Sequence, residues 1–229
     1  MKDLIRLEHV SKIYGNIRAL DDISLSIGRG EFVAVLGESG SGKSTLMNMI
    51  GTLDRPDEGR YYFEGENILH YDDRRLSVYR NRVIGFIFQG FHLDNSLTAL
   101  ENVTMPLVYG GIRPSRRQQM ARQALEQVGL AERMTHRPSQ LSGGQKQRVC
   151  IARALVSQPK IILADEPTGN LDRKSGEMIM DLLTKLWQDG YTVIMVTHNE
   201  QQAQRAARIL EISDGKVLRD EPTRGKINL

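Results

Sequence analysis

The stretch GESGSGKST, from Gly37 to Thr45, constrains the fold of this chain more than any other feature. It fits the pattern G-x-x-x-x-G-K-[ST] and stands between the apolar run FVAVL and the helix-like run STLMNMI. Glycines allow backbone N–H groups to curl around phosphate oxygens, and the helix start that follows adds a favourable partial charge. The sequence therefore predicts an α/β domain that binds a nucleotide through this loop. The residues expected to bind the nucleotide are Gly37, Glu38, Ser39, Gly40, Ser41, Gly42, Lys43, Ser44 and Thr45.

Several short apolar runs predict the strands of that domain. Their hydrophobicity is continuous rather than alternating, which is typical of parallel strands buried on both faces. Near the amino terminus, LIRLEHVSKIY and ISLSI alternate instead, and they predict a half-exposed antiparallel sheet. The continuous runs are EFVAVLG (31–37), RVIGFIFQ (82–89), KIILADE (160–166) and YTVIMVTH (191–198).

Helical patterns fall between these runs. PSRRQQMARQALEQVG has Pro114 at a helix start and Gly129 at its end, with one apolar face. Helices without strands are predicted between about Gly90 and Val156, which indicates an α-helical subdomain inserted into the α/β core. We expect one domain over 1–229, with 1–89 and 157–229 as the core and 90–156 as the subdomain. In RKSGEMIMDLLTKLWQDG the predicted buried stripe is Met178, Ile179, Leu182, Leu183, Leu186 and Trp187.

Composition limits the class of protein. The chain has 229 residues, 40% of them hydrophobic and 26% charged, with a net charge of +3, which is ordinary for a globular domain. The arginine-rich stretches 74–82 and 113–122 do not show the aromatic interleaving that base stacking needs, so they predict solvated faces and no nucleic-acid partner. The lone Cys150 excludes an internal disulfide and is expected to be a buried helical residue. No signal peptide and no run long enough to span a bilayer is seen, so any membrane role is expected to depend on another chain.

Polar residues follow the predicted strands at the edge where open α/β sheets bind ligands. Asp165 and Glu166 end IILADE, His198 ends VIMVTH, and Gln89 ends a third run. An acidic pair after a strand also occurs in ordinary turns. Beside a phosphate loop, Asp165 is predicted to hold Mg²⁺, and Glu166 to accept a proton from the attacking water. His198 is then predicted to contact the γ-phosphate, and Gln89 to contact both Mg²⁺ and water.

A second candidate anion site precedes the helix QKQRVCIARALVSQ. Ser142, Gly143 and Gly144 at a helix start form a cluster of free N–H donors. A serine N-cap after a loop is the simpler interpretation. Because the helix belongs to the strand-poor region, its donors need not face the chain's own Lys43. The alternative is that they meet a phosphate held by another copy of the chain.

LSGGQ followed by IILADEP resembles the ABC ATPase superfamily, and the resemblance covers nearly the whole chain. It implies a P-loop NTPase fold of ABC type, with a mostly parallel sheet, an N-terminal antiparallel β region and the inserted helical subdomain. Tyr14 resembles the aromatic residue that stacks on adenine, Gln89 the Q-loop, Asp172 the D-loop residue and His198 the switch histidine. The signature motif expected to contact the partner copy's ATP is Leu141, Ser142, Gly143, Gly144 and Gln145.

The resemblance also implies cofactors and partners. They are ATP and Mg²⁺, the latter held by Ser44, Gln89 and Asp165, with Glu166, His198 and Gln89 as the catalytic residues. Two copies are expected to form an ATP-dependent homodimer with two sandwiched ATP molecules that drives an integral membrane permease. The chain is then expected to be cytoplasmic and peripheral at the inner face of the cell membrane.

The chain also resembles one subgroup of the ABC ATPase superfamily. FQGFHLDNSLTALENVTMPL and ADEPTGNLDRKSG are similar to the ATPases of lipoprotein-release and macrolide-export systems (LolD/MacB-like). Phe91, His92, Leu93 and Leu97 are candidates for lining a permease-docking groove, with packing inside the subdomain as the alternative. A soluble ABC ATPase that acts on DNA or ribosomes is the competing function, although heptads, CxxC pairs and a tandem repeat are missing. A small-molecule P-loop kinase is opposed by the signature motif, Gln89 and His198.

Overall fold

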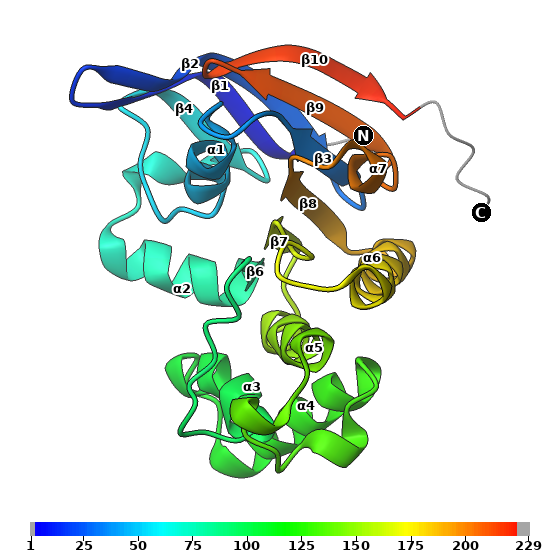
Figure 1. The fold of residues 1–229 in the computed structure, drawn as a ribbon. Helices are drawn as coiled ribbons and strands as arrows, with labels where there is room; N and C mark the ends of the chain where they lie inside the picture. Colours follow the sequence, from blue (N-terminus) through cyan, green and yellow to red (C-terminus); the bar gives the residue numbers. More distant parts are fainter. Residues whose placement is uncertain (1–2, 224–229) are drawn as a thin grey trace. The chain divides into compact units, whose positions relative to one another are not determined.

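The computed structural model describes residues 3–223, which divide into two compact units (Figure 1). The first comprises the described parts of Met1–Leu76 and Leu186–Leu229, and the second is Ser77–Lys185. The strands of the first unit are β1 Asp3–Tyr14, β2 Ile17–Gly28, β3 Phe32–Leu36, β4 Glu58–Phe63, β5 Glu66–Asn67, β8 Thr192–Thr197, β9 Arg208–Ser213 and β10 Lys216–Pro222. Its short helices are α1 Lys43–Ile50, the 3₁₀ turn Ile68–His70 and α7 Glu200–Ala203.

The second unit is mainly helical. It contains the parallel strands β6 Ile84–Ile87 and β7 Ile161–Asp165. The chain passes between the two units within α2 Asp73–Val83 and α6 Arg173–Gln188. The other helices of the unit are α3 Ala99–Tyr109, α4 Pro114–Gln127, α5 Gly143–Leu155 and the 3₁₀ turns Ala131–Arg133 and Pro138–Gln140.

The predicted parallel strands are confirmed. In the first unit β3 lies between β8 and β9 and is parallel to both, while β10 pairs with β9 in antiparallel fashion. Residues 32–35 of β3 are at most 1% exposed, and all six residues of β8 are buried. A strand covered on both faces needs apolar side chains at successive positions, which explains the continuous runs in the sequence.

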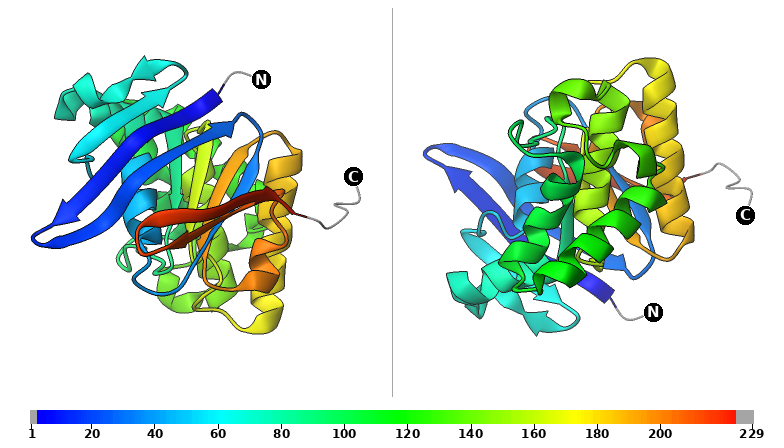
Figure 2. Two further views of the ribbon diagram at one scale, coloured as in Figure 1. Left: turned by 90° about the horizontal axis from the view of Figure 1, so that it is seen from above. Right: turned by 90° about the horizontal axis from the view of Figure 1, so that it is seen from below.

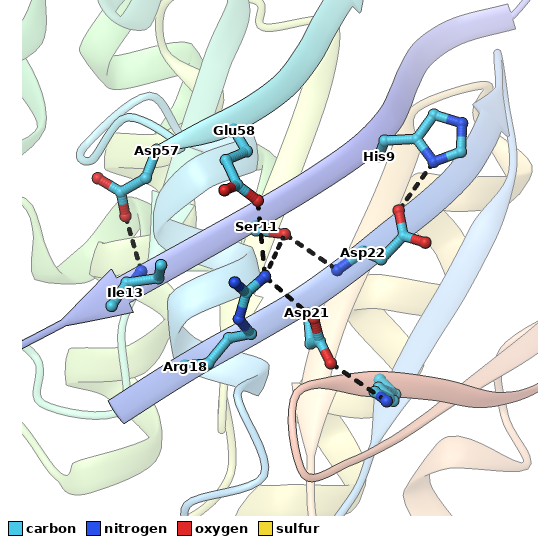
Figure 3. Close-up of polar contacts among 9 residues, drawn as sticks. His9, Ser11, Ile13, Arg18, Asp21, Asp22, Asp57 and Glu58 are labelled. Carbon is cyan, nitrogen blue, oxygen red and sulfur yellow. Dashed lines mark hydrogen bonds and ion pairs between the residues drawn. The ribbon is translucent and has the colours of Figure 1, made fainter. Parts of the chain in front are cut away.

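The N-terminal antiparallel sheet is also confirmed, with strand order β2-β1-β4-β5. Its burial does not alternate strictly, because the pairing of β1 with β2 shifts register between Leu7 and Val10. His9 and Asp22 there adopt left-handed φ angles of 50° and 55°, as expected at a β-bulge. Polar contacts hold the irregular ribbon together: Figure 3 shows His9 beside Asp22, and Ser11 Oγ accepts a hydrogen bond from the Asp22 amide.

The predicted helical region is confirmed too. No strand occurs between residues 90 and 156, and α3, α4 and α5 pack side by side (Figure 2). Helix α4 begins with Pro114 at its first position, and its apolar face buries Ala121 and Leu125. Gly129, just beyond its end, has a φ of 70°, which supports the predicted glycine stop. The predicted subdomain boundaries, at 89/90 and 156/157, stay a prediction.

The stripe predicted for α6 is wrong at one position. Met178 is 46% exposed, whereas Met180, which the prediction omits, is 1% exposed. The buried side chains Ile179, Leu183 and Leu186 lie three to four residues apart and define the centre of the buried face. At about 100° per residue, Met178 falls beyond one edge of that face while Met180 falls within the other. The four-residue repeat alone does not give the rotation of the helix.

No helix within residues 3–223 combines the length and the apolarity that crossing a membrane requires.

Candidate functional site

The phosphate-binding loop lies in the first unit, between β3 and α1. Gly42 has a φ of 104° and stands at the N-cap of α1, where no side chain caps the helix. The amides of the first turn, from Lys43 to Thr45, are therefore not held by a capping side chain, and they carry the positive end of the helix dipole. This is the arrangement that favours an anion such as phosphate.

Two glycines of the loop are required by close backbone approaches. A Cβ on Gly37 would stand 2.3 Å from the Ile212 carbonyl oxygen, and a Cβ on Gly42 would stand 2.5 Å from that of Ala19. Contacts under 3.0 Å to a backbone atom leave no room for a side chain. The two neighbouring strands therefore shape the loop from outside, and glycine is the residue that fits.

Lys43 and Ser41 supply polar groups on the inside of the loop. The Lys43 side chain is mostly buried, and its Nζ donates to the carbonyl oxygen of Glu38, so the chain curls back over itself. Ser41 Oγ is buried and has no hydrogen-bond partner among residues 3–223. A buried hydroxyl and a buried ammonium suit a ligand that both accepts hydrogen bonds and carries negative charge. Ser44, on the first turn, is exposed.

His198 leaves the sheet at the same edge as the loop. Leu36 at the end of β3 pairs with Thr197 at the end of β8, so Gly37 and His198 follow neighbouring parallel strands. His198 is exposed. Tyr14 ends β1 in the same unit, and the Thr45 hydroxyl lies close enough to affect its phenol. The first unit thus brings the loop, His198 and Tyr14 together.

Gln89 and Asp165 lie at the ends of neighbouring strands in the second unit. Ile87 pairs with Ala164 at the ends of the parallel strands β6 and β7, so the residues that follow leave the same edge. The Gln89 carbonyl oxygen accepts a hydrogen bond of 2.8 Å from Asn170 Nδ2. An amide and a carboxylate oxygen at one edge are ligand types that Mg²⁺ accepts.

Glu166 sits in a strained backbone conformation. Its φ is 44°, in the left-handed region that costs a non-glycine residue about 1–3 kcal/mol. A turn stabilises it, because the Gly169 amide donates a hydrogen bond of 3.0 Å to the Glu166 carbonyl oxygen. This backbone conformation sets the direction in which the Glu166 side chain leaves the chain after the buried strand.

The signature motif opens α5 with a complete capping box. Ser142 Oγ accepts from the Gln145 amide at 3.3 Å, and Gln145 Oε1 accepts from the Ser142 amide at 2.9 Å. The simpler interpretation of Ser142, as an N-cap, is therefore correct, and it leaves the anion hypothesis open. The capping box uses two of the amides, so the amides of Gly143 and Gly144 are the remaining donors at this helix start.

Asp172 contacts the start of α6. Its carboxylate accepts hydrogen bonds from the Ser175 amide at 2.9 Å and from the Ser175 hydroxyl at 2.7 Å, and these bonds lower the pKa of Asp172. A Cβ on Gly144 would stand 3.0 Å from Ser175 Oγ. Ser175 therefore joins the D-loop to the signature motif inside one unit. Ser175 was not among the residues predicted from the sequence, although its spacing of three residues from Asp172 is typical of a helix cap.

Helix α5 also holds the segment after Gln89. The thiol of Cys150 donates to the Phe91 carbonyl oxygen at 3.0 Å, and Arg153 donates to those of Phe91 and His92 at 3.1 and 2.6 Å. Cys150 is 1% exposed, and burial raises the pKa of its thiol to about 11. The expectation of a buried helical cysteine is confirmed. The role of Arg153 was missed because its partners lie about sixty residues away along the chain.

The candidate docking residues differ in exposure. His92 is exposed, and its ring packs edge-on against Phe88 with centroids 5.4 Å apart. Phe91, Leu93 and Leu97 are half-buried. Docking and internal packing both remain compatible with this exposure, so the groove stays a prediction.

Comparison with known proteins gives the family. The model of the family described as ABC transporter matches residues 20–169. The chain is 51% identical over 219 residues to the uncharacterized ABC transporter ATP-binding protein YknY of Bacillus subtilis, covering 94% of this chain and 95% of that protein.

It is 50% identical over 221 residues to the macrolide export ATP-binding/permease protein MacB of Hyphomonas neptunium, covering 95% of this chain. The chain spans only 34% of that relative's length. A solved dimeric structure of the ATP-binding cassette MJ0796, in a post-hydrolysis state with ADP and Pi, superposes with a TM-score of 0.87. The two sequences are 47% identical, and the superposition covers 96% of this chain and 99% of the chain in that structure.

These matches extend over nearly the whole chain and include the loop, the signature motif and the strand that ends in Asp165. They confirm the expected fold class and the resemblance to macrolide-export ATPases. The chain belongs to the ABC transporter family, as one of its ATP-binding cassettes.

Proposed function

We propose that the chain is the ATP-binding and ATP-hydrolysing subunit of an ABC transporter that powers a separate membrane permease. Two copies would pair head to tail, each completing the ATP site of the other. The observation that carries the proposal is that two helix starts, at Gly42 and at Ser142, leave backbone amides without a capping side chain, and that they lie in two units of one chain.

In each copy, the loop residues 37–45 would bind the phosphates, with Lys43 as the main cation and Tyr14 against the adenine. The amides of Gly143 and Gly144 would bind the γ-phosphate held by the partner copy. A γ-phosphoryl group in transfer spreads negative charge over its oxygens, so donors from two directions stabilise it better than donors from one. A dimeric structure of a cassette that is 47% identical supports the pairing of two copies.

The predicted ligands have the donor chemistry that a bound Mg²⁺ needs. Ser44, Gln89 and Asp165 would hold it, and they offer hydroxyl, amide and carboxylate oxygens, the hard donors that this ion prefers. Residues 3–223 contain no group of three or more His, Cys, Asp or Glu able to hold a metal. Mg²⁺ commonly takes few protein ligands and shares the rest with nucleotide phosphates. When bound, Mg²⁺ neutralises phosphate charge.

The chain's own residues would carry the proton and orient the water. Glu166 would accept a proton from the attacking water, and its strained backbone would keep the carboxylate in position. His198 would donate a hydrogen bond to the γ-phosphate, and the Gln89 amide would orient the water. Asp172, as the cap of α6, would hold the signature motif through Ser175.

The partner and the location follow from the relatives. Several relatives carry ATP-binding and permease parts in one protein and are named for export. This chain would therefore act on a permease of the export or force-transmitting kind, and would sit at the cytoplasmic face of the membrane through it. A soluble ABC ATPase acting on DNA or ribosomes has less support, because these relatives are named for export.

Co-purification tests the proposal. The tagged chain should be expressed in its own host, extracted from the membranes in mild detergent, and assayed for bound membrane proteins and for ATP hydrolysis. We expect a stable complex whose ATPase activity is lost in Lys43→Ala. Isolation of the chain with ribosomes or DNA, and without any membrane protein, would overturn the assignment.

A further inference from the structure

The phenol of Tyr14 is anchored although its ring is not buried. Tyr14 ends β1 with 47% of its surface exposed. Its hydroxyl donates a hydrogen bond of 2.5 Å to Asp54 Oδ2. An exposed tyrosine ordinarily keeps rotamer freedom that must be given up when a ligand stacks on it. In this chain that freedom is already restricted.

Asp54 joins Tyr14 to Lys12. The second carboxylate oxygen, Oδ1, accepts a hydrogen bond of 2.9 Å from Lys12 Nζ, which also donates to the Arg55 carbonyl oxygen at 2.7 Å. The Lys12 side chain is only 11% exposed, and its ammonium lies 5.2 Å from the centroid of the Tyr14 ring. One carboxylate thus holds both the hydroxyl of the ring and the cation beside it.

The loop that carries Asp54 is itself well anchored. It follows α1, the helix that the phosphate loop opens. The Ile13 amide donates to Asp57 Oδ2 at 2.7 Å, a contact drawn in Figure 3. The Arg55 guanidinium donates to the Tyr71 carbonyl oxygen at 2.9 Å and to Asp73 at 3.0 Å. Asp54 is therefore a fixed point for the ring.

The protonation states of Tyr14 and Asp54 keep their hydrogen bond formed at neutral pH. The hydrogen bond to Asp54, together with partial burial, raises the pKa of Tyr14 to about 12, so the phenol keeps its proton. Partial burial acts to raise the pKa of Asp54, but hydrogen bonds from Lys12, Tyr14 and the Arg55 amide outweigh it and lower that pKa. A neutral donor and a charged acceptor make one of the stronger kinds of hydrogen bond.

We propose that Asp54, together with Lys12, is a positioning residue for the Tyr14 ring, which it holds ready for the adenine base. The inference rests on the proposed role of Tyr14 in stacking on adenine. Orienting the ring before binding reduces the entropy that the side chain loses on binding. Because the anchor follows α1, the loop that holds the Tyr14 ring and the phosphate loop flank the same helix.

Binding measurements with two ligands, one with and one without the adenine base, separate the positioning of the Tyr14 ring from a general loss of phosphate binding. ATP and inorganic tripolyphosphate should be titrated calorimetrically into the full chain and into Tyr14→Phe, Asp54→Asn and Tyr14→Ala. Tyr14→Phe keeps the ring and removes the anchoring hydroxyl. We expect its ATP affinity to fall about 3- to 10-fold, the cost of immobilising one side chain, with tripolyphosphate affinity unchanged. Tyr62→Phe, at a tyrosine on β4, is the matched control and should change neither.

A double-variant cycle tests the link to Asp54. In Asp54→Asn one acceptor oxygen is lost, and adding Tyr14→Phe should cause no further loss of ATP affinity, because the two side chains act through one bond. ATP affinity reduced in Tyr14→Ala but normal in Tyr14→Phe would overturn the positioning role alone. An unchanged ATP affinity in Tyr14→Ala would overturn the stacking role and this inference with it. Equal losses for ATP and tripolyphosphate would also overturn the inference.

Discussion

The backbone amide of Gly215 donates a hydrogen bond of 3.0 Å to the carbonyl oxygen of Ser41, so the turn between β9 and β10 supports the phosphate-binding loop from outside. The Gly215 carbonyl oxygen in turn accepts from the Asp21 amide at 2.9 Å. Lys216 Nζ lies 3.1 Å from Asp21 Oδ2, which adds an ion pair at the same place. Two segments far apart in the sequence, β2 and the turn between β9 and β10, therefore meet behind the loop.

Gly215→Ala should weaken ATP binding. The φ of Gly215 is 74°, and an added Cβ would stand 2.8 Å from the Ala19 carbonyl oxygen, so the turn must move and take Ser41 with it. We expect ATP affinity to fall about tenfold, or about 1.4 kcal/mol. Gly65→Ala is the control, since Gly65 has a φ of 87° with open space around it. Calorimetric titration should show normal ATP affinity for the control, and an equal loss in both variants would refute the supporting role of the turn.

Glu166→Gln should bind ATP normally and hydrolyse it more than about 10²-fold more slowly, since an amide cannot accept the proton from water. The variant should accumulate an ATP-bound dimer, which light scattering detects. Glu132→Gln, at an exposed position on a 3₁₀ turn, removes the same charge and should keep normal turnover. Free hydrolysis by Glu166→Gln would exclude the general-base role.

Ser142→Arg should abolish hydrolysis, with a loss above about 10²-fold, while the monomer still binds nucleotide. The substitution removes the cap of α5 and sets a bulky cation at the helix start, opposing the helix dipole. Ser115→Arg makes the same change on the exposed first turn of α4 and should leave activity intact. Phosphate release and nucleotide binding should be measured in parallel. Normal activity of Ser142→Arg would count against a site shared between copies.

Cys150 should resist alkylation in the folded protein. Burial raises the pKa of its thiol to about 11, and a raised thiol pKa leaves little of the reactive thiolate at about pH 8. Iodoacetamide followed by mass spectrometry should label the chain in denaturant, where an ordinary thiol pKa returns, and not in buffer. Labelling of the folded chain at the rate of a free thiol would show that the α5 face against Phe91 opens readily.

Much of this molecule follows from local patterns along the chain. Continuous apolar runs predicted β3, β7 and β8, because a strand covered on both faces favours apolar side chains at successive positions. The ends of α4 could be predicted because proline is favoured at the first position of a helix and glycine just beyond its last. The phosphate loop could be predicted because its chemistry needs glycine, lysine and a helix start in adjacent positions.

Other features depend on contacts between residues distant in the sequence. Asp54 reaches Tyr14 across forty residues, and Arg153 reaches Phe91 across sixty-two. The rotation of α6 that exposes Met178 is set by neighbouring elements. Periodicity along one segment tells which element forms, because backbone geometry repeats locally. Periodicity does not tell which face of that element packs against its neighbours. Contacts with distant residues decide that, and these contacts exist only once the chain has folded.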